Sequence, residues 1–260
     1  MLQDNSHTDT ATRAPNDKRD ILISVKNLHK SFGDNHVLRG FDLTLYDEEN
    51  LMIIGKSGSG KSVLLKCIIR LNIPDSGELM VLGKNVPELS REEMDRLRAD
   101  VGFLFQGSAL YDSMTVRENL EFPLRRHLDR LGTDDIDKVV MEALESVGLA
   151  HAIDLMPAEL SGGMKRRVAL ARTIILKPKI ILYDEPSSGL DPITAKEISQ
   201  LILDIQKQYK TASLIISHDM DFARIISNRV IMLIDGINYA SGTFDALSKS
   251  QDPKIKAFFK

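Results

Sequence analysis

The sequence from residue 55 to residue 62 reads Gly55-Lys56-Ser57-Gly58-Ser59-Gly60-Lys61-Ser62. This stretch fits G-x-x-x-x-G-K-[ST], the pattern of a phosphate-binding loop. Its glycines let the backbone curl so that successive N–H groups point inward and form a nest for an anion. Lys61 adds a positive charge for the β- and γ-phosphates, and the Ser62 hydroxyl can ligate Mg²⁺. The stretch therefore predicts a nucleotide site, although a Gly/Ser turn with an incidental lysine would have the same composition.

The residues on either side favour the nucleotide site over a simple turn. Residues 51–54 (LMII) form an apolar run, as expected of a buried parallel strand, and residues 63–69 (VLLKCII) indicate a packed helix. Strand, loop and helix in this order place the phosphates at a helix N-terminus, where the dipole favours negative charge. We expect the nucleotide to contact the stretch from Gly55 to Val63. The loop alone does not separate kinases, GTPases, helicases and transport ATPases.

The composition is typical of a soluble globular protein, with 260 residues, 43% hydrophobic and 27% charged. A net charge of −3 gives no bulk attraction to nucleic acid, so no nucleic-acid partner is expected. No apolar run approaches the ~18 residues that span a bilayer, and the polar first twenty residues do not resemble a secretory signal. The single cysteine, Cys67, fits a reducing cytosol and is expected to be a buried structural thiol.

The chain divides into a short tail and one large unit. Residues 1–20 lack periodicity and are expected to form a disordered tail, ahead of a nucleotide-binding unit over 21–260. Apolar residues and short turns at 33–35 and 47–50 predict antiparallel strands before the loop. Phe32 follows the first of these strands, and its ring is either a platform for adenine or an ordinary packing residue. Helical periodicity from about 115 to 160 predicts a small helical insert over about 110–175.

Polar residues follow three apolar runs that are predicted to be buried strands. Gln106 follows residues 101–105, the pair Asp184 and Glu185 ends residues 179–183, and His218 ends residues 214–217. Ligands in open α/β sheets bind beyond the carboxyl ends of the strands, so these side chains are expected near the phosphates. In that position Asp184 and Gln106 can hold Mg²⁺, Glu185 can polarise a water, and His218 can donate to a phosphate oxygen. Taken singly, each of them could equally be a turn, helix-cap or surface residue.

A second glycine-containing stretch lies at residues 160–164, Leu160-Ser161-Gly162-Gly163-Met164. Ser161 is a good N-cap for the helix that follows, and the two glycines leave backbone N–H groups uncovered. The stretch is therefore either a second anion site or a capped helix whose basic face, including Arg166 and Arg167, is solvated.

Taken in order, these parts resemble those of ATP-binding cassette (ABC) proteins, from about Ile21 to Phe259. The resemblance implies an α/β P-loop ABC-ATPase fold, with a mixed central sheet, an antiparallel β subdomain and an inserted helical subdomain. It implies ATP and Mg²⁺ as cofactors. It implies that Phe32 stacks on adenine and that Ser62, Gln106 and Asp184 ligate Mg²⁺. Glu185, His218 and Gln106 would be catalytic. In a head-to-tail homodimer, Ser161, Gly162 and Gly163 of one chain would bind the ATP held by the other chain.

A narrower resemblance is carried by residues 105–116 (FQGSALYDSMTV), 156–164 (MPAELSGGM) and 191–194 (DPIT). These stretches look like those of the MlaF-type ATPases, which work with MlaE-type permeases and MCE lipid-binding proteins. Met164 replaces the glutamine of many cassettes, and Val63 stands where threonine often follows the loop. Neither change touches a phosphate-contacting atom.

The narrower resemblance implies an ATP-hydrolysing subunit of a phospholipid or lipid transporter. Its partners would be MlaE-type permease subunits and an MCE protein, and it would lie peripherally on the cytoplasmic face of the inner membrane. The alternatives are the ATPase of another importer or exporter, for example for an amino acid, a soluble cassette protein acting on DNA or ribosomes, a P-loop small-molecule kinase, and a nucleotide-gated module without hydrolysis.

Overall fold

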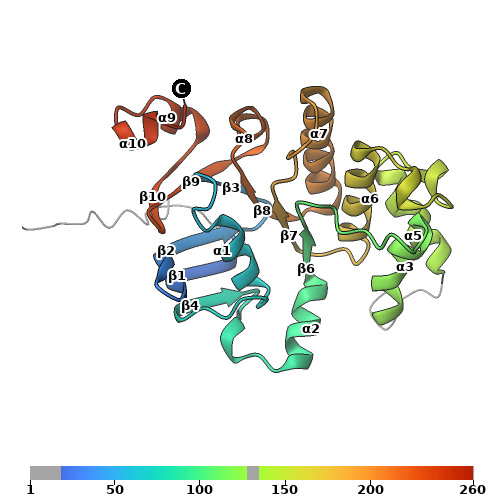
Figure 1. The fold of residues 1–260 in the computed structure, drawn as a ribbon. Helices are drawn as coiled ribbons and strands as arrows, with labels where there is room; N and C mark the ends of the chain where they lie inside the picture. Colours follow the sequence, from blue (N-terminus) through green and yellow to red (C-terminus); the bar gives the residue numbers. More distant parts are fainter. Residues whose placement is uncertain (1–18, 128–134, 260) are drawn as a thin grey trace, which may run out of the picture.

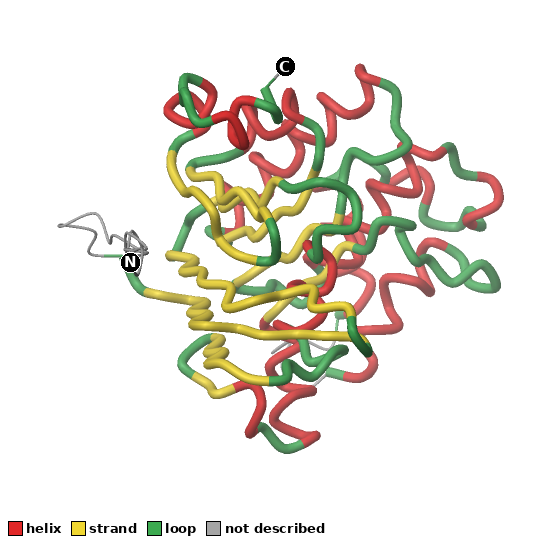
Figure 2. Tube along the Cα trace, turned by 60° about the vertical axis from the view of Figure 1, so that its left-hand side comes forward, coloured by secondary structure: helices red, strands yellow, loops and turns green. Residues whose placement is uncertain are grey.

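The computed structural model describes residues 19–127 and 135–259, which form two β-sheets and a set of surrounding helices (Figure 1). Figure 2 shows the strands gathered on one side of the molecule and most helices on the other. Residues 1–18, most of the predicted disordered tail, lie outside the described residues. Asp20, which the prediction also assigned to the tail, accepts a hydrogen bond from the N–H of Asp47 (2.9 Å).

The smaller sheet precedes and follows the phosphate-binding loop in sequence. Its strands run in the order β2-β1-β4-β5, with antiparallel pairing throughout. The predicted turn at 33–35 connects the two long strands, and Gly33 adopts a positive φ of 58° there. The strands are β1 (Ile21–Phe32), β2 (Asn35–Tyr46), β4 (Ser76–Val81) and β5 (Lys84–Asn85).

The larger sheet carries the strands whose ends were predicted to meet. Its order is β10-β9-β3-β8-β7-β6; five of the strands are parallel to one another, and the edge strand β10 is antiparallel. The central strands are covered on both faces, which explains why they read as unbroken apolar runs. The strands are β3 (Asn50–Ile54), β6 (Val101–Leu104), β7 (Ile180–Asp184), β8 (Ala212–Ser217), β9 (Arg229–Ile234) and β10 (Ile237–Gly242).

Several helices begin at the caps that the sequence indicates. Thr115 accepts a hydrogen bond from the N–H of Glu118 and forms a capping box, and Ser161 accepts one from the N–H of Met164. The helices are α1 (Lys61–Ile68), α2 (Arg91–Asp100), α3 (Val116–Arg126), α5 (Ile136–Ser146), α6 (Gly162–Ile174), α7 (Pro192–Tyr209), α8 (Met220–Ile226), α9 (Phe244–Ser248) and α10 (Pro253–Lys256).

Helices α3, α5 and α6 lie together, away from the smaller sheet (Figure 1). They share one apolar cluster that includes Leu120, Leu124, Val140 and Leu144. We propose that they form the helical insert predicted over about 110–175; residues 128–134 of that span lie outside the described residues.

One ion pair joins the two sheets. Glu49, just before β3, is almost completely buried, and its carboxylate accepts from Arg229 at the start of β9 (Nε–Oε1 2.8 Å, Nη2–Oε2 3.0 Å). Arg229 also donates to the carbonyl of Thr44 on β2 (2.5 Å). The pair therefore fixes the smaller sheet against the larger one at the end opposite the phosphate-binding loop.

Cys67 is fully buried on α1, as predicted, and burial raises the pKa of its thiol to about 11. Within residues 19–127 and 135–259, no helix combines the length and apolarity needed to cross a membrane.

Candidate active site

The phosphate-binding loop joins β3 to α1 and depends on glycine at its last turn. Gly60, the N-cap of α1, has a φ of 102°, and a Cβ built there would lie 2.5 Å from Cγ1 of Val37. Gly58 also has a positive φ, of 77°. A residue with a side chain would be strained at both positions, so the glycines give the loop its shape.

Lys61 is buried at the base of the loop and contacts the loop's own backbone. Its Nζ donates to the carbonyls of Gly55 (2.8 Å) and Lys56 (3.2 Å) and lies 3.8 Å from Oε1 of Glu185. Burial lowers the pKa of Lys61, while the carboxylates of Glu185 and Asp184 act in the opposite direction. The ammonium is thus held between the loop carbonyls and Glu185.

Two of the three side chains predicted to hold Mg²⁺, Ser62 and Asp184, lie next to each other. Ser62 Oγ donates to Oδ1 of Asp184 (3.0 Å). Burial raises the pKa of Asp184, and the hydrogen bond from Ser62 opposes that shift. No cluster of three or more His, Cys, Asp or Glu side chains suited to a metal occurs in the described part of the chain. One hydroxyl and one carboxylate fit Mg²⁺, because this ion is usually bound through one or two carboxylates together with substrate phosphates and water.

Glu185 and His218 form a contact beside Lys61. His218 Nδ1 lies 2.9 Å from Oε2 of Glu185, and the His218 backbone N–H donates to the same oxygen (3.3 Å). Glu185 has a φ of 50°, a left-handed conformation that is uncommon for a residue with a side chain. The two residues directly follow the neighbouring strands β7 and β8, so the parallel pairing of the sheet brings them together.

A cleft of about 550 Å³ opens beside these groups. Phe32, Gln106, Glu185 and His218 line it, together with residues 57–63 of the loop. Gly55 and Lys56 are not among the lining residues and instead supply the carbonyls that hold Lys61. The Phe32 ring is half exposed at the cleft, so it is not a core residue. Asn35 and Val37, at the start of β2, also line the cleft; the sequence interpretation missed both.

The Ser161–Gly163 stretch does not line this cleft. Ser161 caps α6 through the N–H of Met164 (3.2 Å), and Gly163 packs against Thr194 at the start of α7. One chain therefore does not bring this stretch to its own phosphate-binding loop, as the implied head-to-tail arrangement requires.

Two arginines of α6 contact the loop that contains Gln106. Arg166 is buried and donates to the carbonyls of Phe105 (3.0 Å) and Ser188 (3.3 Å), so the interpretation of this basic stretch as a fully solvated face is wrong at Arg166. Arg172 donates to the carbonyls of Ser108 (3.0 Å) and Ala109 (2.8 Å). Composition gave no signal for these contacts, because a basic run on a helix usually faces solvent.

Comparison with known proteins identifies the family. The sequence profile described as ABC transporter matches residues 38–188. The chain is 39% identical over 238 residues to the probable ribonucleotide transport ATP-binding protein mkl of Mycobacterium leprae (strain TN), covering 92% of this chain and 68% of that protein. It is 38% identical over 239 residues to the intermembrane phospholipid transport system ATP-binding protein MlaF of Haemophilus influenzae, covering 92% of this chain and 90% of that protein. It is 40% identical over 215 residues to the methionine import ATP-binding protein MetN of Clostridium tetani, covering 83% of this chain and 67% of that protein.

Solved structures give the same answer for the fold. The cbiO1 protein from Clostridium perfringens, part of the ABC transporter complex cbiONQ, superposes with a TM-score of 0.81 at 29% identity, covering 90% of this chain and 92% of that one. The ATP-binding cassette MJ0796, solved as a dimer in a post-hydrolysis state with ADP and Pi, superposes with a TM-score of 0.77 at 31% identity, covering 86% and 99%. These superpositions confirm the predicted fold class. ABC cassettes dimerise and act with membrane permeases. The chain belongs to the ABC transporter family, as an ATP-binding cassette that is an ATPase.

Proposed function

We propose that this cassette powers a transporter of phospholipid or a similar lipid across the bacterial envelope. The observation that carries the proposal is the similarity to MlaF, which extends over nearly the full length of both chains and includes the stretch after Gln106. The similarity to mkl spans about two thirds of that protein. The similarity to MetN supports an alternative, amino-acid import.

The cleft supports ATP hydrolysis by positioning and charge. Lys61 would hold the β- and γ-phosphates, and Ser62 and Asp184 would hold Mg²⁺. When bound, Mg²⁺ would neutralise charge that develops on the transferred phosphoryl group. Glu185 would polarise the attacking water, and His218 would donate to a γ-phosphate oxygen. Because Nδ1 of His218 is engaged by Glu185, Nε2 is the ring nitrogen available to that oxygen.

Gln106 would contact Mg²⁺ or the attacking water. Its Nε2 donates to Oγ of Ser188 (3.3 Å), and its side chain is exposed at the cleft. The side-chain carbonyl is the part that suits a metal ligand, whereas the amide N–H already has a protein partner.

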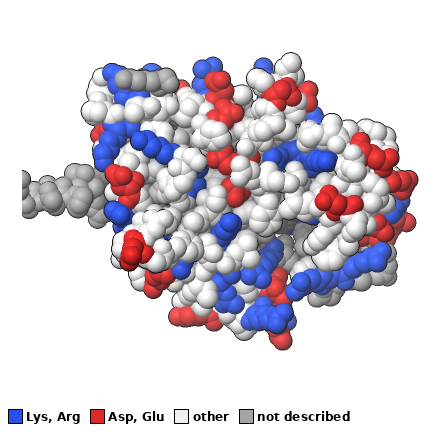
Figure 3. Space-filling model, viewed as in Figure 1, with Lys and Arg blue, Asp and Glu red and all other residues white. Residues whose placement is uncertain are grey.

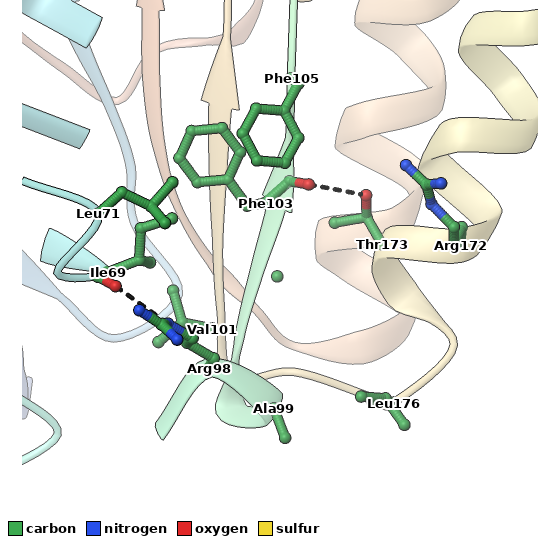
Figure 4. A pocket seen from close by; sticks show the side chains of 11 residues that line it. Ile69, Leu71, Arg98, Ala99, Val101, Phe103, Phe105, Arg172, Thr173 and Leu176 are labelled. Carbon is green, nitrogen blue, oxygen red and sulfur yellow. Dashed lines mark hydrogen bonds between the residues drawn. The ribbon is translucent and has the colours of Figure 1, made fainter. Parts of the chain in front are cut away.

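A groove of about 310 Å³ close to Gln106 supports permease docking (Figure 4). Ile69 and Leu71 line one side, Phe103 of β6 and Phe105 just after that strand lie between them and α6, and α6 lines the other side. Leu71 of the groove exposes 53% of its surface. Tyr111 and Phe122, which expose 44% and 47%, have ring centroids 5.0 Å apart, and Arg172 of the groove lies over the Tyr111 ring. Neighbouring exposed apolar residues mark interaction surfaces. We propose that a short helix of an MlaE-type permease occupies this groove. Movement of the Gln106 loop would reach that helix directly, because Phe105 lines the groove and precedes Gln106.

Charged side chains surround the groove. On the face drawn in Figure 3, Lys and Arg lie among Asp and Glu along the lower edge, where α2 and α3 lie. Arg98 of α2 lines the groove itself. We propose a peripheral position on the cytoplasmic face of the inner membrane, with an MCE protein on the other side.

Purification from native membranes in mild detergent tests the proposal. We expect two copies of the chain together with two MlaE-type permease subunits and an MCE protein. Co-purification of an amino-acid permease instead would contradict the lipid assignment and favour the alternative. In addition, deletion of the gene should disturb the lipid asymmetry of the outer envelope and sensitise cells to detergent.

A further inference from the structure

Arg166 is a buried cation that touches three separate segments. It lies on α6, one helical turn after Gly162, with only 4% of its surface exposed. Nη1 donates to the carbonyl of Phe105, the residue before Gln106 (3.0 Å), and Nη2 donates to the carbonyl of Ser188, in the turn after Glu185 (3.3 Å). One side chain thus joins α6, which begins at Gly162, to the loops that carry Gln106 and Glu185.

Ser188 extends these contacts to both predicted catalytic groups. Its Oγ accepts from Nε2 of Gln106 (3.3 Å), and its N–H donates to the carbonyl of Glu185 (3.1 Å). That second bond closes a turn that starts at the left-handed backbone of Glu185. Arg166 is therefore connected to Gln106 and to Glu185 through a single residue.

Packing alone does not account for an arginine at this position. Among the described residues, no carboxylate forms an ion pair with Arg166, and its Nε is buried without a partner. Burial accordingly lowers the pKa of Arg166. An apolar side chain would fill the space without these disadvantages, whereas the planar guanidinium donates from two different nitrogens, Nη1 and Nη2, and so holds the two carbonyls in a fixed geometry.

We propose that Arg166 is a positioning residue that makes the Gln106 loop, the Ser188 turn and α6 move as one unit. ATP in a chain's own cleft would then shift its Ser161–Gly163 stretch, which faces the second ATP in a head-to-tail dimer. The inference rests on the ATPase assignment and on that dimer; it does not depend on the transported lipid. It predicts that Arg166 transmits the state of one ATP site to the other.

The test compares Arg166→Met and Arg166→Lys with Arg167→Met in the full chain. Arg167 is a matched control on the same helix, because it donates to the Val147 carbonyl (3.3 Å) and to Glu197 (2.8 Å) and touches neither loop. Hydrogen–deuterium exchange of residues 161–170 is measured with and without ATP, alongside ATP affinity, kcat and the Hill coefficient of hydrolysis.

Both Arg166 variants should bind ATP with an affinity within about threefold of the native chain and still protect residues 55–63. The ATP response of residues 161–170 should be lost, the Hill coefficient should fall toward 1, and kcat should fall roughly tenfold to a hundredfold. The Arg166→Lys variant should lose the response as well, because a single ammonium nitrogen does not reproduce the fixed fork in which Nη1 and Nη2 each hold one carbonyl. If Arg166→Met does not fold, the result with Arg166→Lys decides the test. Arg167→Met should keep the native response.

Two results would overturn the inference. In the first, Arg166→Met has a lower melting temperature but keeps the native exchange response to ATP and the native Hill coefficient. Arg166 would then have a packing role only. The other is an equal loss in Arg167→Met, which would make the effect a general property of α6. Neither result bears on the lipid assignment, which depends on the partners found in membranes.

Discussion

The left-handed backbone conformation of Glu185 sets the direction of its carboxylate in the site. Its φ of 50° is costly for a residue with a side chain, and such conformations concentrate at functional sites. Here the conformation directs the carboxylate toward both Lys61 (3.8 Å) and His218 (2.9 Å).

Replacing this carboxylate by its amide separates binding from hydrolysis. Glu185→Gln keeps an oxygen that can accept from His218 but removes the base and one negative charge, so hydrolysis should fall about 10²–10⁴-fold. ATP-dependent dimerisation should persist or strengthen, because less repulsion faces the nucleotide. Phosphate release and analytical ultracentrifugation measure the two properties; hydrolysis at the native rate would exclude Glu185 as the base.

Lys61→Ala should weaken ATP binding at least about tenfold, because a charge-assisted contact contributes roughly 1.5–3 kcal/mol. Calorimetry measures the change. Lys26→Ala is a suitable control, since Lys26 pairs with Glu78 on the surface, far from the cleft residues. Equal affinity in Lys61→Ala and the native chain would contradict the loop assignment.

The buried carboxylate of Asp184 is expected to lower the stability of the nucleotide-free fold while serving Mg²⁺ binding. Burial raises its pKa, so the ionised carboxylate is less favourable in the nucleotide-free fold than in the unfolded chain. Asp184→Asn should therefore raise the melting temperature of the nucleotide-free chain while abolishing the Mg²⁺ dependence of ATP binding. A lower melting temperature without nucleotide would show that the charge is compensated better than its burial indicates.

At the element scale, the ion pair of Glu49 and Arg229 supports the junction between the two sheets. Glu49→Gln would leave Arg229 without its countercharge. Fully buried pairs lose about 3–5 kcal/mol when one partner is removed; because 27% of the Arg229 side chain stays exposed, we expect a smaller loss of about 2 kcal/mol in the free energy of unfolding. Urea denaturation measures it.

The control for this prediction is another pair of the same charges. Glu78→Gln breaks the Lys26 pair, whose side chains are 67% and 68% exposed, and should cost less than about 1 kcal/mol. Similar losses in the two variants would mean that burial does not set the strength of the Glu49 pair.

Elements with strong local signals could be predicted from the sequence. Thr115 and Ser161 cap helices as expected, and the apolar runs before Gln106 and His218 form parallel strands. The short helices α9 and α10 were missed, because a single turn of helix carries little periodicity. Their stability comes from packing, such as the edge-to-face contact of Phe244 and Phe259.

At the scale of the whole molecule, the order of motifs predicted the family and the fold, and both are confirmed by comparison. The rule that ligands bind at the carboxyl ends of strands also predicted that Gln106, Glu185 and His218 lie near one another, and all three line one cleft. Their individual roles remain predictions. The burial of Arg166 could not be predicted, because its partners lie about sixty residues before it and twenty residues after it in the chain.

The burial of Cys67 makes the chain convenient for site-directed labelling. A thiol with a pKa of about 11 is ionised to roughly one part in a thousand at pH 8, and its side chain is fully covered. The folded chain should therefore leave maleimides unreacted for hours, and one equivalent should react after denaturation in guanidinium. Rapid labelling of the folded chain would instead reveal frequent opening of α1. A cysteine placed at an exposed position would then carry a spin label without removal of the native thiol, so distances across the dimer could be followed through the ATP cycle.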